Sequence, residues 1–421
     1  MRANQGTRDI IHLDMDAYFA SIEQRDVPFY RRKPLLVCHT DDPTSIRGVI
    51  SSASYEARLF GIKSGMSVLE AKKLCPKGIY IQGNYEKYLF NSRKITEICK
   101  RYSNLVEIFS VDEMFLDVTG TKRFFGEPVD IARSIQRDIK KILNLSASIG
   151  VGPNKLVAKM ASEFKKPAGI TVIKPDELPQ ILAPLPVDDI VGVGKRMKRH
   201  FDRIGINTIG DLASFPEEPL RKRFGIVGVY LHRAALGIDN SPVSPEDKGI
   251  EIKSFGHSSA LGSGVSDFNK LSQVLLGLCE GVTRRMRKKG YTGRTVTLRL
   301  CLARLFSISR SKSLEGFTDF TYRVYPVARG ILNKEKSLFK KYPATLIGVS
   351  VSNLMQDNEG RQISIFDLLC PKEQVLTRAV DKIKDKYGER VIVRSSLLNW
   401  ERNYHAVPRI ELASSRPKWR S

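Results

Sequence analysis

Two short stretches of the sequence each place a pair of carboxylates inside an apolar run. They read IIHLDMDAYFA at residues 10–20 and IFSVDEMFLD at residues 108–117. In the first stretch, strict alternation puts Asp14 and Asp16 on one face of a predicted strand and apolar side chains on the other. Two aspartates at this spacing repel each other unless a cation lies near them. The first pair therefore indicates either a cation site or a solvated strand end.

The second pair, Asp112 and Glu113, is adjacent, so the two side chains converge only if the strand kinks or turns there. Magnesium prefers carboxylate oxygens and usually takes one or two of them together with substrate phosphates. We expect Asp14, Asp112 and Glu113 to hold two Mg²⁺ ions, about 4 Å apart, around a triphosphate. One ion would activate an attacking hydroxyl, and the other would stabilise the leaving pyrophosphate. Solvated strand-end acids are the alternative, which has to hold for both pairs at once.

Groups that bind phosphate are expected in SSASYEARLFGIKSGMS, residues 51–67. A helix over this stretch places Tyr55 and Arg58 on one face, with the Ser52 hydroxyl just before its first turn. A helix start and an arginine fork together suit a triphosphate. The lysine pair that ends at Lys166, before a Pro-Ala-Gly turn, offers another phosphate contact. A capped surface helix and a solvated loop explain these two stretches about as well.

The overall charge points to a polyanionic partner. The 421 residues contain 69 Lys and Arg against 45 Asp and Glu, a formal net charge of +24. Nucleic acid is favoured over a membrane because no apolar span or basic amphipathic helix accompanies this charge. The first residues lack the apolar run of a signal peptide, so we expect a cytoplasmic protein. The six cysteines form no C-x-x-C pair, which argues against a zinc site and a disulfide framework.

Much of the positive charge follows a linker-like segment, NSPVSPEDKG, at residues 240–249. Residues 250–355 hold 18 Lys and Arg against 6 Asp and Glu. Periodicity predicts the order strand, helix, strand, strand, helix, strand in this block. We expect its sheet to bind DNA through a cationic face, with Arg299 and Arg310 among the contacts. A merely solvated basic face is the alternative.

A second DNA contact is expected where Gly192, Val193 and Gly194 open a turn before a helix that begins near Lys195. The pattern is typical of a helix-hairpin-helix, in which glycine amides at a helix start face a phosphate with no side chain in the way. A plain helix pair is the alternative.

Five motifs, taken in order, resemble the Y-family translesion DNA polymerases of the bacterial DinB type. They are DMDAYFASIEQRD, SYEARLFGIKSGM, SVDEMFLDVT, SIGVGPNKLVAKMASEFKKPAG and VGVGKRMKRHFDRIGI. The resemblance runs from about residue 9 to about residue 355. It implies an α+β multidomain fold: an antiparallel palm with helices, small fingers, a helical thumb and an α/β little finger.

The resemblance also implies domain bounds. The expected bounds are palm 1–20 and 82–173, fingers 21–81, thumb with the helix-hairpin-helix 174–241, linker 242–250, little finger 251–355 and tail 356–421.

Further site roles follow from the resemblance, residue by residue. The Met15 backbone carbonyl would be an additional metal ligand, and Phe19 would be the steric gate that excludes a ribose 2′-hydroxyl. Tyr18 would pack beside the sugar, and Ser51 would lie over the nascent base pair. The resemblance assigns Ser52, Tyr55, Arg58 and Lys166 to the triphosphate, and leaves Asp16 a supporting role.

The tail shows a weaker match. RQISIFDLL, residues 361–369, resembles a sliding-clamp peptide with Gln362, Ile365 and Phe366 as anchors. A core strand is the alternative. Residues 372–388 are helix-like, and ERVIVRSSLL after them is strand-like.

The sequence therefore predicts a magnesium-dependent, template-directed, low-fidelity DNA polymerase without a proofreading exonuclease. Its expected partners are primer-template DNA, dNTP and a sliding clamp, with no membrane and a monomeric chain. A non-catalytic DNA-binding repair factor with a polymerase fold is the alternative. Other palm enzymes are disfavoured because the GGDEF and Tyr-x-Asp-Asp signatures are absent.

Overall fold

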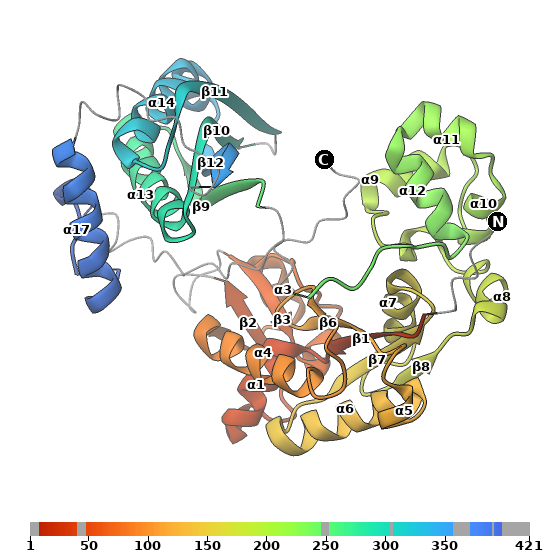
Figure 1. Cartoon of the computed structure of the whole chain (residues 1–421). Helices are drawn as coiled ribbons and strands as arrows, with labels where there is room; N and C mark the ends of the chain where they lie inside the picture. The colour runs from red at the N-terminus through yellow and green to blue at the C-terminus, as the bar shows by residue number, and fades with distance from the viewer. Residues whose placement is uncertain are drawn as a thin grey trace. The chain divides into compact units, whose positions relative to one another are not determined.

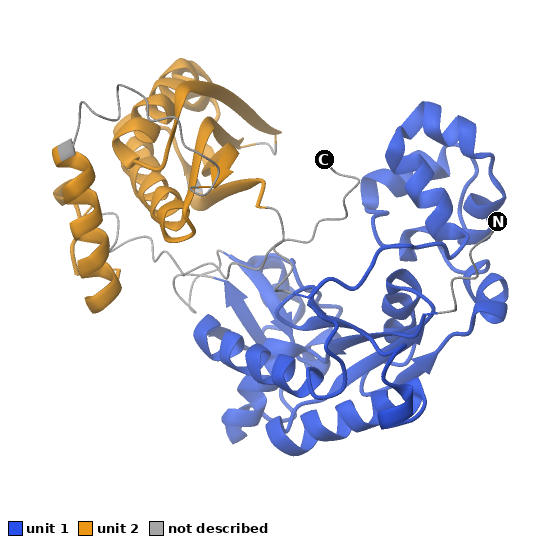
Figure 2. Cartoon of the chain, viewed as in Figure 1, with its two compact units in different colours: residues 1–250, 408–421 blue, residues 251–407 orange. Residues whose placement is uncertain are grey.

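The computed structural model describes residues 8–39, 48–245, 252–303, 306–356, 371–389 and 391–397 (Figure 1). The chain forms two compact units: described residues up to 245 fall in the first, and those from 252 to 397 fall in the second (Figure 2). Within the described ranges, no helix has both the length and the apolarity that a membrane crossing requires.

A five-stranded sheet forms the centre of the first unit. Its order is β5-β6-β1-β7-β8. The strands are β1 Ile10–Met15, β5 Val106–Ile108, β6 Glu113–Asp117, β7 Ala147–Gly152 and β8 Ile170–Val172. β1 pairs antiparallel with both neighbours, β6 and β7, while β7 and β8 are parallel. All six residues of β1 are buried, so this strand is covered on both faces.

Helices cover the two faces of this sheet differently (Figure 1). The main core lies between one face and helices α4, Tyr85–Cys99, and α6, Pro128–Leu143. Ile11, Leu13 and Met15 all belong to this core, as the alternation predicted. The other face of β1 and β7 is covered by α7, Lys155–Glu163. A short helix, α5 Lys122–Phe125, precedes α6.

Gly150 sets how closely α7 approaches β7. A Cβ atom at this position would lie 1.9 Å from the Ala158 carbonyl oxygen and 2.4 Å from the Ser162 amide nitrogen. Because both are backbone atoms, no rotamer change relieves the clash. The absence of a side chain at Gly150 therefore lets α7 lie directly on the central strands.

A smaller three-stranded sheet, β3-β2-β4, follows in the same unit. Helix α1, Tyr18–Asp26, and the turn η1, Pro28–Tyr30, lead into it. Its elements are β2 Leu35–His39, β3 Val49–Ala53, α2 Tyr55–Arg58, α3 Val68–Leu74 and β4 Ile79–Gln82. This sheet and its helices have a separate small core.

The remainder of the first unit is helical and has a core of its own. Its elements are η2 Pro175–Glu177, α8 Leu178–Leu182, η3 Val187–Asp189, α9 Lys195–Asp202, α10 Ile209–Ser214, α11 Glu217–Phe224 and α12 Ile226–Ala235. The chain then returns to the five-stranded sheet, where Val243 is buried against Ile10 and Phe115. The described part of the expected linker thus packs on the first unit.

The second unit has the predicted element order. A four-stranded antiparallel sheet, β11-β10-β12-β9, is covered by helices on one face. Its elements are β9 Ser254–Val265, α13 Phe268–Lys288, β10 Tyr291–Leu302, β11 Phe306–Thr318, α14 Thr321–Lys334, α15 Lys336–Lys341 and β12 Ala344–Gln356. The periodicity of the sequence was therefore enough to predict the order of the helices and strands in the second unit.

Two more elements follow in the second unit. The helix-like stretch forms α17, Pro371–Tyr387. The strand prediction for the next stretch is wrong over the described residues 391–397, which end in the turn η4, Ser395–Leu397. Leu397 is buried in the core of the unit, so its apolar character reflects packing without strand pairing.

We predict that Gly150→Ala destabilises the protein by about 3 kcal/mol or more, because its methyl group would collide with backbone atoms. Thermal or urea unfolding of the purified chain measures the change. Gly120→Ala is the matched control, since a Cβ there meets no atom within 4 Å. Equal stability of the two variants would contradict the proposed close packing.

Candidate active site

The β1–β6 register brings the two carboxylate pairs together. Asp14 lies opposite Glu113 in the antiparallel ladder, so their side chains share one face of the sheet. Asp112 lies in the turn just before β6, and its carbonyl accepts a hydrogen bond of 3.0 Å from the Met15 amide. The acids are thus neighbours because two strands pair, although about a hundred residues separate them in the sequence.

These acids line a pocket of about 260 Å³. All the residues predicted to bind metal or nucleotide lie on its wall: Asp14, Met15, Tyr18, Phe19, Ser51, Ser52, Tyr55, Arg58, Asp112, Glu113 and Lys166. Asp16, Ala17, Ser64 and Glu163 complete the lining. The pocket therefore combines groups from β1, α1, the small sheet, the turn before β6 and the end of α7.

Two lysines neutralise the carboxylates. Lys166 Nζ lies 2.7 Å from Asp14 Oδ2, and Lys159 Nζ lies 2.5 Å from Glu113 Oε1. Asp112 instead accepts a hydrogen bond from the Ser110 hydroxyl. The two lysine ammonium groups thus supply the positive charge that neighbouring acids need when water is largely excluded.

Burial dominates the electrostatics of the site. It raises the pKa of Asp14 to about 7, against the opposing effect of the Lys166 ammonium. Burial alone would lower the pKa of Lys166, but the Asp14 and Glu163 carboxylates raise it to about 12. Burial also lowers the pKa of His12 well below its usual value, so this ring is neutral beneath the acids.

The donor set fits a hard divalent cation. Three carboxylates and the backbone of β1 are oxygen ligands of the kind that Mg²⁺ takes, and the pocket leaves room for a phosphate. Across the described ranges, however, no three His, Cys, Asp or Glu side chains already form a metal cage. Asp14 and Glu113 are instead each paired with a lysine.

Asp16 has a different set of partners. Its Oδ1 accepts hydrogen bonds from the Ser148 hydroxyl at 2.7 Å and the Tyr55 hydroxyl at 3.2 Å. Its Oδ2 accepts one from the Ala168 amide at 2.9 Å. Asp16 thus ties β1 to β7, to α2 and to the turn after Lys166, and so fixes the pocket wall.

Phe19 stands on the wall of the pocket in a fixed orientation. Its ring stacks on Tyr88 of α4, with centroids 4.2 Å apart and planes 11° apart. Tyr18 is buried beside it and donates a hydrogen bond of 2.7 Å to the Tyr88 carbonyl. Stacked aromatic rings have few alternative rotamers, which makes Phe19 a rigid boundary.

The small sheet supplies hydroxyl and guanidinium groups on the opposite wall. As predicted, a short helix begins after Ser54, whose side chain caps it, and carries Tyr55 and Arg58. The Arg58 guanidinium lies over the Tyr55 ring at 4.8 Å from its centroid. Its Nε donates to the Ala53 carbonyl at 3.1 Å. The stacking orients Arg58 on the pocket wall.

Three groups in or beside the pocket escaped the sequence interpretation. Lys159 and Glu163 lie one helical turn apart on α7, and Glu163 holds Lys166 at 2.8 Å. Their spacing in KLVAKMASE was a signal, but it is also that of any surface helix. Ser64 follows α2 in a loop and carried no distinctive pattern.

The predicted helix-hairpin-helix residues precede α9. Gly192 has a φ of +110°, a conformation that favours glycine, and Gly194 is the N-cap of the helix that begins at Lys195. Val193 is buried in the helical core. Four further residues, three on α9 and one at its end, were not singled out from the sequence. They line a second cavity of about 220 Å³: Arg196, Arg199, His200 and Arg203.

The two arginines predicted on the second unit lie on opposite faces of its sheet. Arg310 pairs with the core residue Leu298 in the ladder, so it points toward the helical layer, where it binds Glu335 at 2.8 Å. Arg299 pairs with Ser309 on the open face and is exposed. The prediction of one face carrying both arginines is therefore wrong.

The open face is rich in small hydroxyl side chains. Thr297 and Ser311 pair there at 2.8 Å between hydroxyl oxygens, and Thr295 and Ser313 pair at 3.0 Å. The expected cationic sheet face is thus mainly a hydroxyl face with Arg299 on it.

Comparisons with known proteins agree with this geometry. Residues 13–163 match the model of the impB/mucB/samB family, and residues 252–365 match that of its C-terminal domain. The DNA polymerase IV of Moorella thermoacetica is 40% identical over 387 residues, which cover 92% of this chain and 95% of the relative. That of Pelotomaculum thermopropionicum is 39% identical over 386 residues, covering 92% of this chain and 94% of the relative.

Solved structures are similar as well. The Y-family DNA polymerase chimera Dbh-Dpo4(243-245)-Dbh has a TM-score of 0.73 and 28% identity, covering 83% of this chain and 99% of that chain. An insertion ternary complex of Dbh DNA polymerase has a TM-score of 0.56 and 27% identity over the same shares. The chain therefore belongs to the impB/mucB/samB family of Y-family DNA polymerases.

Proposed function

We propose that the pocket is the active site of a template-directed, low-fidelity translesion DNA polymerase that lacks a proofreading exonuclease. The observation that carries this proposal is the placement of Asp14 opposite Glu113, with Asp112 beside them, in a pocket shared with a rigid aromatic wall and phosphate-binding groups. The fold supports it, because palm, fingers, thumb and little finger are the layout of the matching polymerases. The intact acid set disfavours the non-catalytic alternative.

The residues of the pocket divide the work of nucleotidyl transfer. Asp14, Asp112, Glu113 and the Met15 carbonyl would hold two Mg²⁺ ions, which would activate the primer hydroxyl and stabilise the leaving pyrophosphate when bound. Lys166 binds Asp14 and lines the pocket, so it neutralises Asp14 in the free enzyme and would be available to the triphosphate in the loaded one.

Groups on the small sheet would hold the rest of the triphosphate. Arg58 offers a planar donor fork, and Ser52 and Tyr55 offer hydroxyl groups on the same wall. Ser51, beside them, is small, so it would leave space over the nascent base pair. A loose cover of this kind is expected to accept damaged template bases at the cost of selectivity.

The expected domains are proposed with their bounds: palm 1–20 and 82–173, fingers 21–81, thumb 174–241, linker 242–250 and little finger 251–355.

Primer-template DNA would contact the glycine turn at 192–194 with Lys195. It would also contact the open hydroxyl face around Arg299. Backbone amides and small hydroxyl groups suit phosphate contacts without sequence reading. Arg310 is left out of this surface because its pairing with Leu298 places it on the helical side of the sheet.

A sliding clamp is proposed as a further partner of a monomeric enzyme. Gln362, Ile365 and Phe366, the expected anchors, lie outside the described residues. Support comes from the sequence alone. Tethering would raise the local concentration of a weakly processive enzyme at its template.

We predict that Asp112→Asn lowers primer extension by at least about 10³-fold, because it removes a charge that the two-metal site requires. Single-turnover extension with Mg²⁺ and dNTP measures the rate. Asp117→Asn, the same change at the far end of β6, is the control and should retain activity. Wild-type rates for a folded Asp112→Asn protein would overturn the assignment.

We predict that Phe19→Ala raises ribonucleotide incorporation relative to deoxynucleotide incorporation by about 10- to 100-fold, because the ring no longer fills the space beside the sugar. The ratio of kcat/KM values for rNTP and dNTP measures the effect. Phe124→Ala, at an exposed aromatic residue, should leave the ratio unchanged. Unchanged discrimination by the Phe19 variant would refute the gate.

We predict that Phe366→Ala abolishes stimulation of extension by the clamp while extension without the clamp stays at the wild-type rate. Processivity assays with and without loaded clamp measure both quantities. Equal stimulation of the variant and the wild type would reject the peptide assignment.

A further inference from the structure

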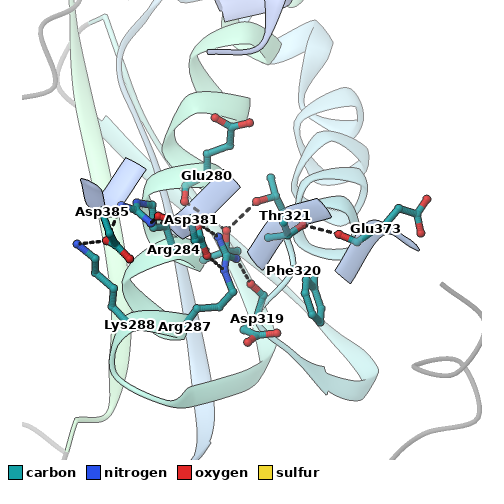
Figure 3. Close-up of polar contacts among 12 residues, drawn as sticks. Glu280, Arg284, Arg287, Lys288, Asp319, Phe320, Thr321, Glu373, Asp381 and Asp385 are labelled. Carbon is teal, nitrogen blue, oxygen red and sulfur yellow. Dashed lines mark hydrogen bonds and ion pairs between the residues drawn. The ribbon is translucent and has the colours of Figure 1, made fainter. Parts of the chain in front are cut away.

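The last two turns of α13 carry a cationic cluster that is covered by the chain's own acids (Figure 3). The cluster consists of Arg284, Arg287 and Lys288. Their partners are Asp381 and Asp385 of α17 together with Glu389, just beyond that helix. The tail beyond β12 thus folds back on the helical side of its own unit.

Arg284 is the centre of the contact. Its guanidinium binds Asp381 at 3.0 Å, Asp385 at 3.0 Å and Glu389 at 2.8 Å. Only 6% of the residue is exposed. Three acids around one buried guanidinium satisfy its donors in several directions. Without these acids, Arg284 would be a partly buried cation in need of another anion.

The neighbouring cations extend the contact along α13. Arg287 Nε binds Asp381 Oδ2 at 2.6 Å, and Lys288 Nζ binds Asp385 Oδ1 at 3.2 Å. The hydrogen bond from Lys288, with Arg284 nearby, lowers the pKa of Asp385. The contact between Lys288 and Asp385 is therefore one of full charges at neutral pH.

Apolar burial contributes little to this contact. The large apolar side chains of α17 are turned outward: Val375 is 68% exposed, Leu376 64% and Tyr387 63%. An amphipathic helix usually buries such a face. Since α17 presents its acids to α13 and its apolar groups to solvent, charge attraction holds it, and salt weakens attraction of this kind.

The chain beyond α17 is fastened in a different way. Leu397 is buried in the core of the unit, and Val393 packs against the same core. Arg394 forms an ion pair with Glu280 of α13. This apolar anchor would keep α17 close to the cluster after its ionic contacts break, so the contact could re-form quickly.

We propose that α17 is a displaceable acidic strap over a phosphate-binding site formed by Arg284, Arg287 and Lys288, and that the DNA backbone is the anion that displaces it. Asp381 and Asp385 stand about 6 Å apart along the helix axis and present a row of negative charge, as a nucleic-acid strand does. The site adds to the DNA contacts of the proposed polymerase and rests on its DNA binding, while catalysis is not required for it.

The test compares DNA affinity in two charge-matched variants. Asp381→Asn with Asp385→Asn releases the strap, and Glu315→Gln with Asp176→Asn removes the same charge at exposed positions outside the strap. Binding of a blunt DNA duplex is measured without nucleotide across a salt series. We expect the strap variant to bind about tenfold tighter at low salt and to have a salt slope steeper by about 2 to 3. The matched control should show neither change.

A second pair of changes tests whether the uncovered cluster is the binding site. Arg287→Gln with Lys288→Gln should lower affinity only slightly in the native background, because DNA gains these two cations there only by breaking their contacts with Asp381 and Asp385. The same pair should abolish the gain in the Asp381→Asn, Asp385→Asn background. If Arg287→Gln with Lys288→Gln lowered DNA affinity equally in both backgrounds, the two residues would act only as ordinary surface charge, and the proposal would be overturned. It would also be overturned if the Asp381→Asn, Asp385→Asn variant bound DNA no more tightly than the unaltered chain.

Hydrogen exchange of the unaltered chain gives a reading that does not depend on any variant. Amides of 371–389 should exchange faster when the DNA duplex is added, and faster at high salt, while those of β10 stay protected. Unchanged exchange of α17 in DNA would show a permanently docked helix and reject the strap. Because neither assay uses dNTP, a failed polymerase assignment would leave these outcomes readable.

Discussion

The candidate active site depends on positive charge beside two carboxylates on paired strands. Asp14 and Glu113 face each other across the β1–β6 ladder, in a position where neither is fully hydrated. Such a pair persists only beside positive charge. In the free protein the positive charge comes from Lys166 and Lys159, and the proposed metal ions and triphosphate would replace these two ion pairs.

Several features of the first unit place those two lysines beside the acids. Lys159 is carried by α7, which lies close to β7 because Gly150 has no side chain. Lys166 is held by the turn that Asp16 fixes through the Ala168 amide. Helix α7 also supplies the Ser162 hydroxyl, which lies 2.8 Å from Nδ1 of His12 beneath the acids. The scaffold thus controls the acids through helix packing as much as through strand pairing.

Short-range sequence patterns predicted the features of the structure that depend on neighbouring residues alone. Alternation in β1 separated the core residues from the acids, and the element order of the second unit followed from periodicity. The resemblance to known polymerases assigned the pocket residues from β1, α1, the small sheet and the turn before β6, and all of them line one cavity. Short-range spacing and ordered motifs were enough for these.

Long-range contacts account for what the sequence left open. Strand register determines the face on which Arg310 lies, and a single-residue shift reverses it, so a basic residue in a predicted strand has no assigned side. The strand-like stretch near Leu397 buries its apolar side chain in the core without joining β11 or β9, the edge strands of the sheet. The sequence also did not predict that the acids of α17 bind Arg284. Taken separately, the charges on α13 and on α17 are typical of a solvent-exposed helix face.

Both units thus hold cationic side chains against the chain's own carboxylates at positions suited to phosphate. In the pocket, Lys166 binds Asp14, and on α13, Arg284 binds Asp381. An enzyme with a net charge of +24 would otherwise attract nucleic acid at every such cluster, whether or not the contact were productive. Internal carboxylates lower that background attraction, and a phosphate ligand would have to compete with them for Lys166 and Arg284. Under the two proposals, the same pairing makes the phosphate contacts of the protein conditional on its substrate.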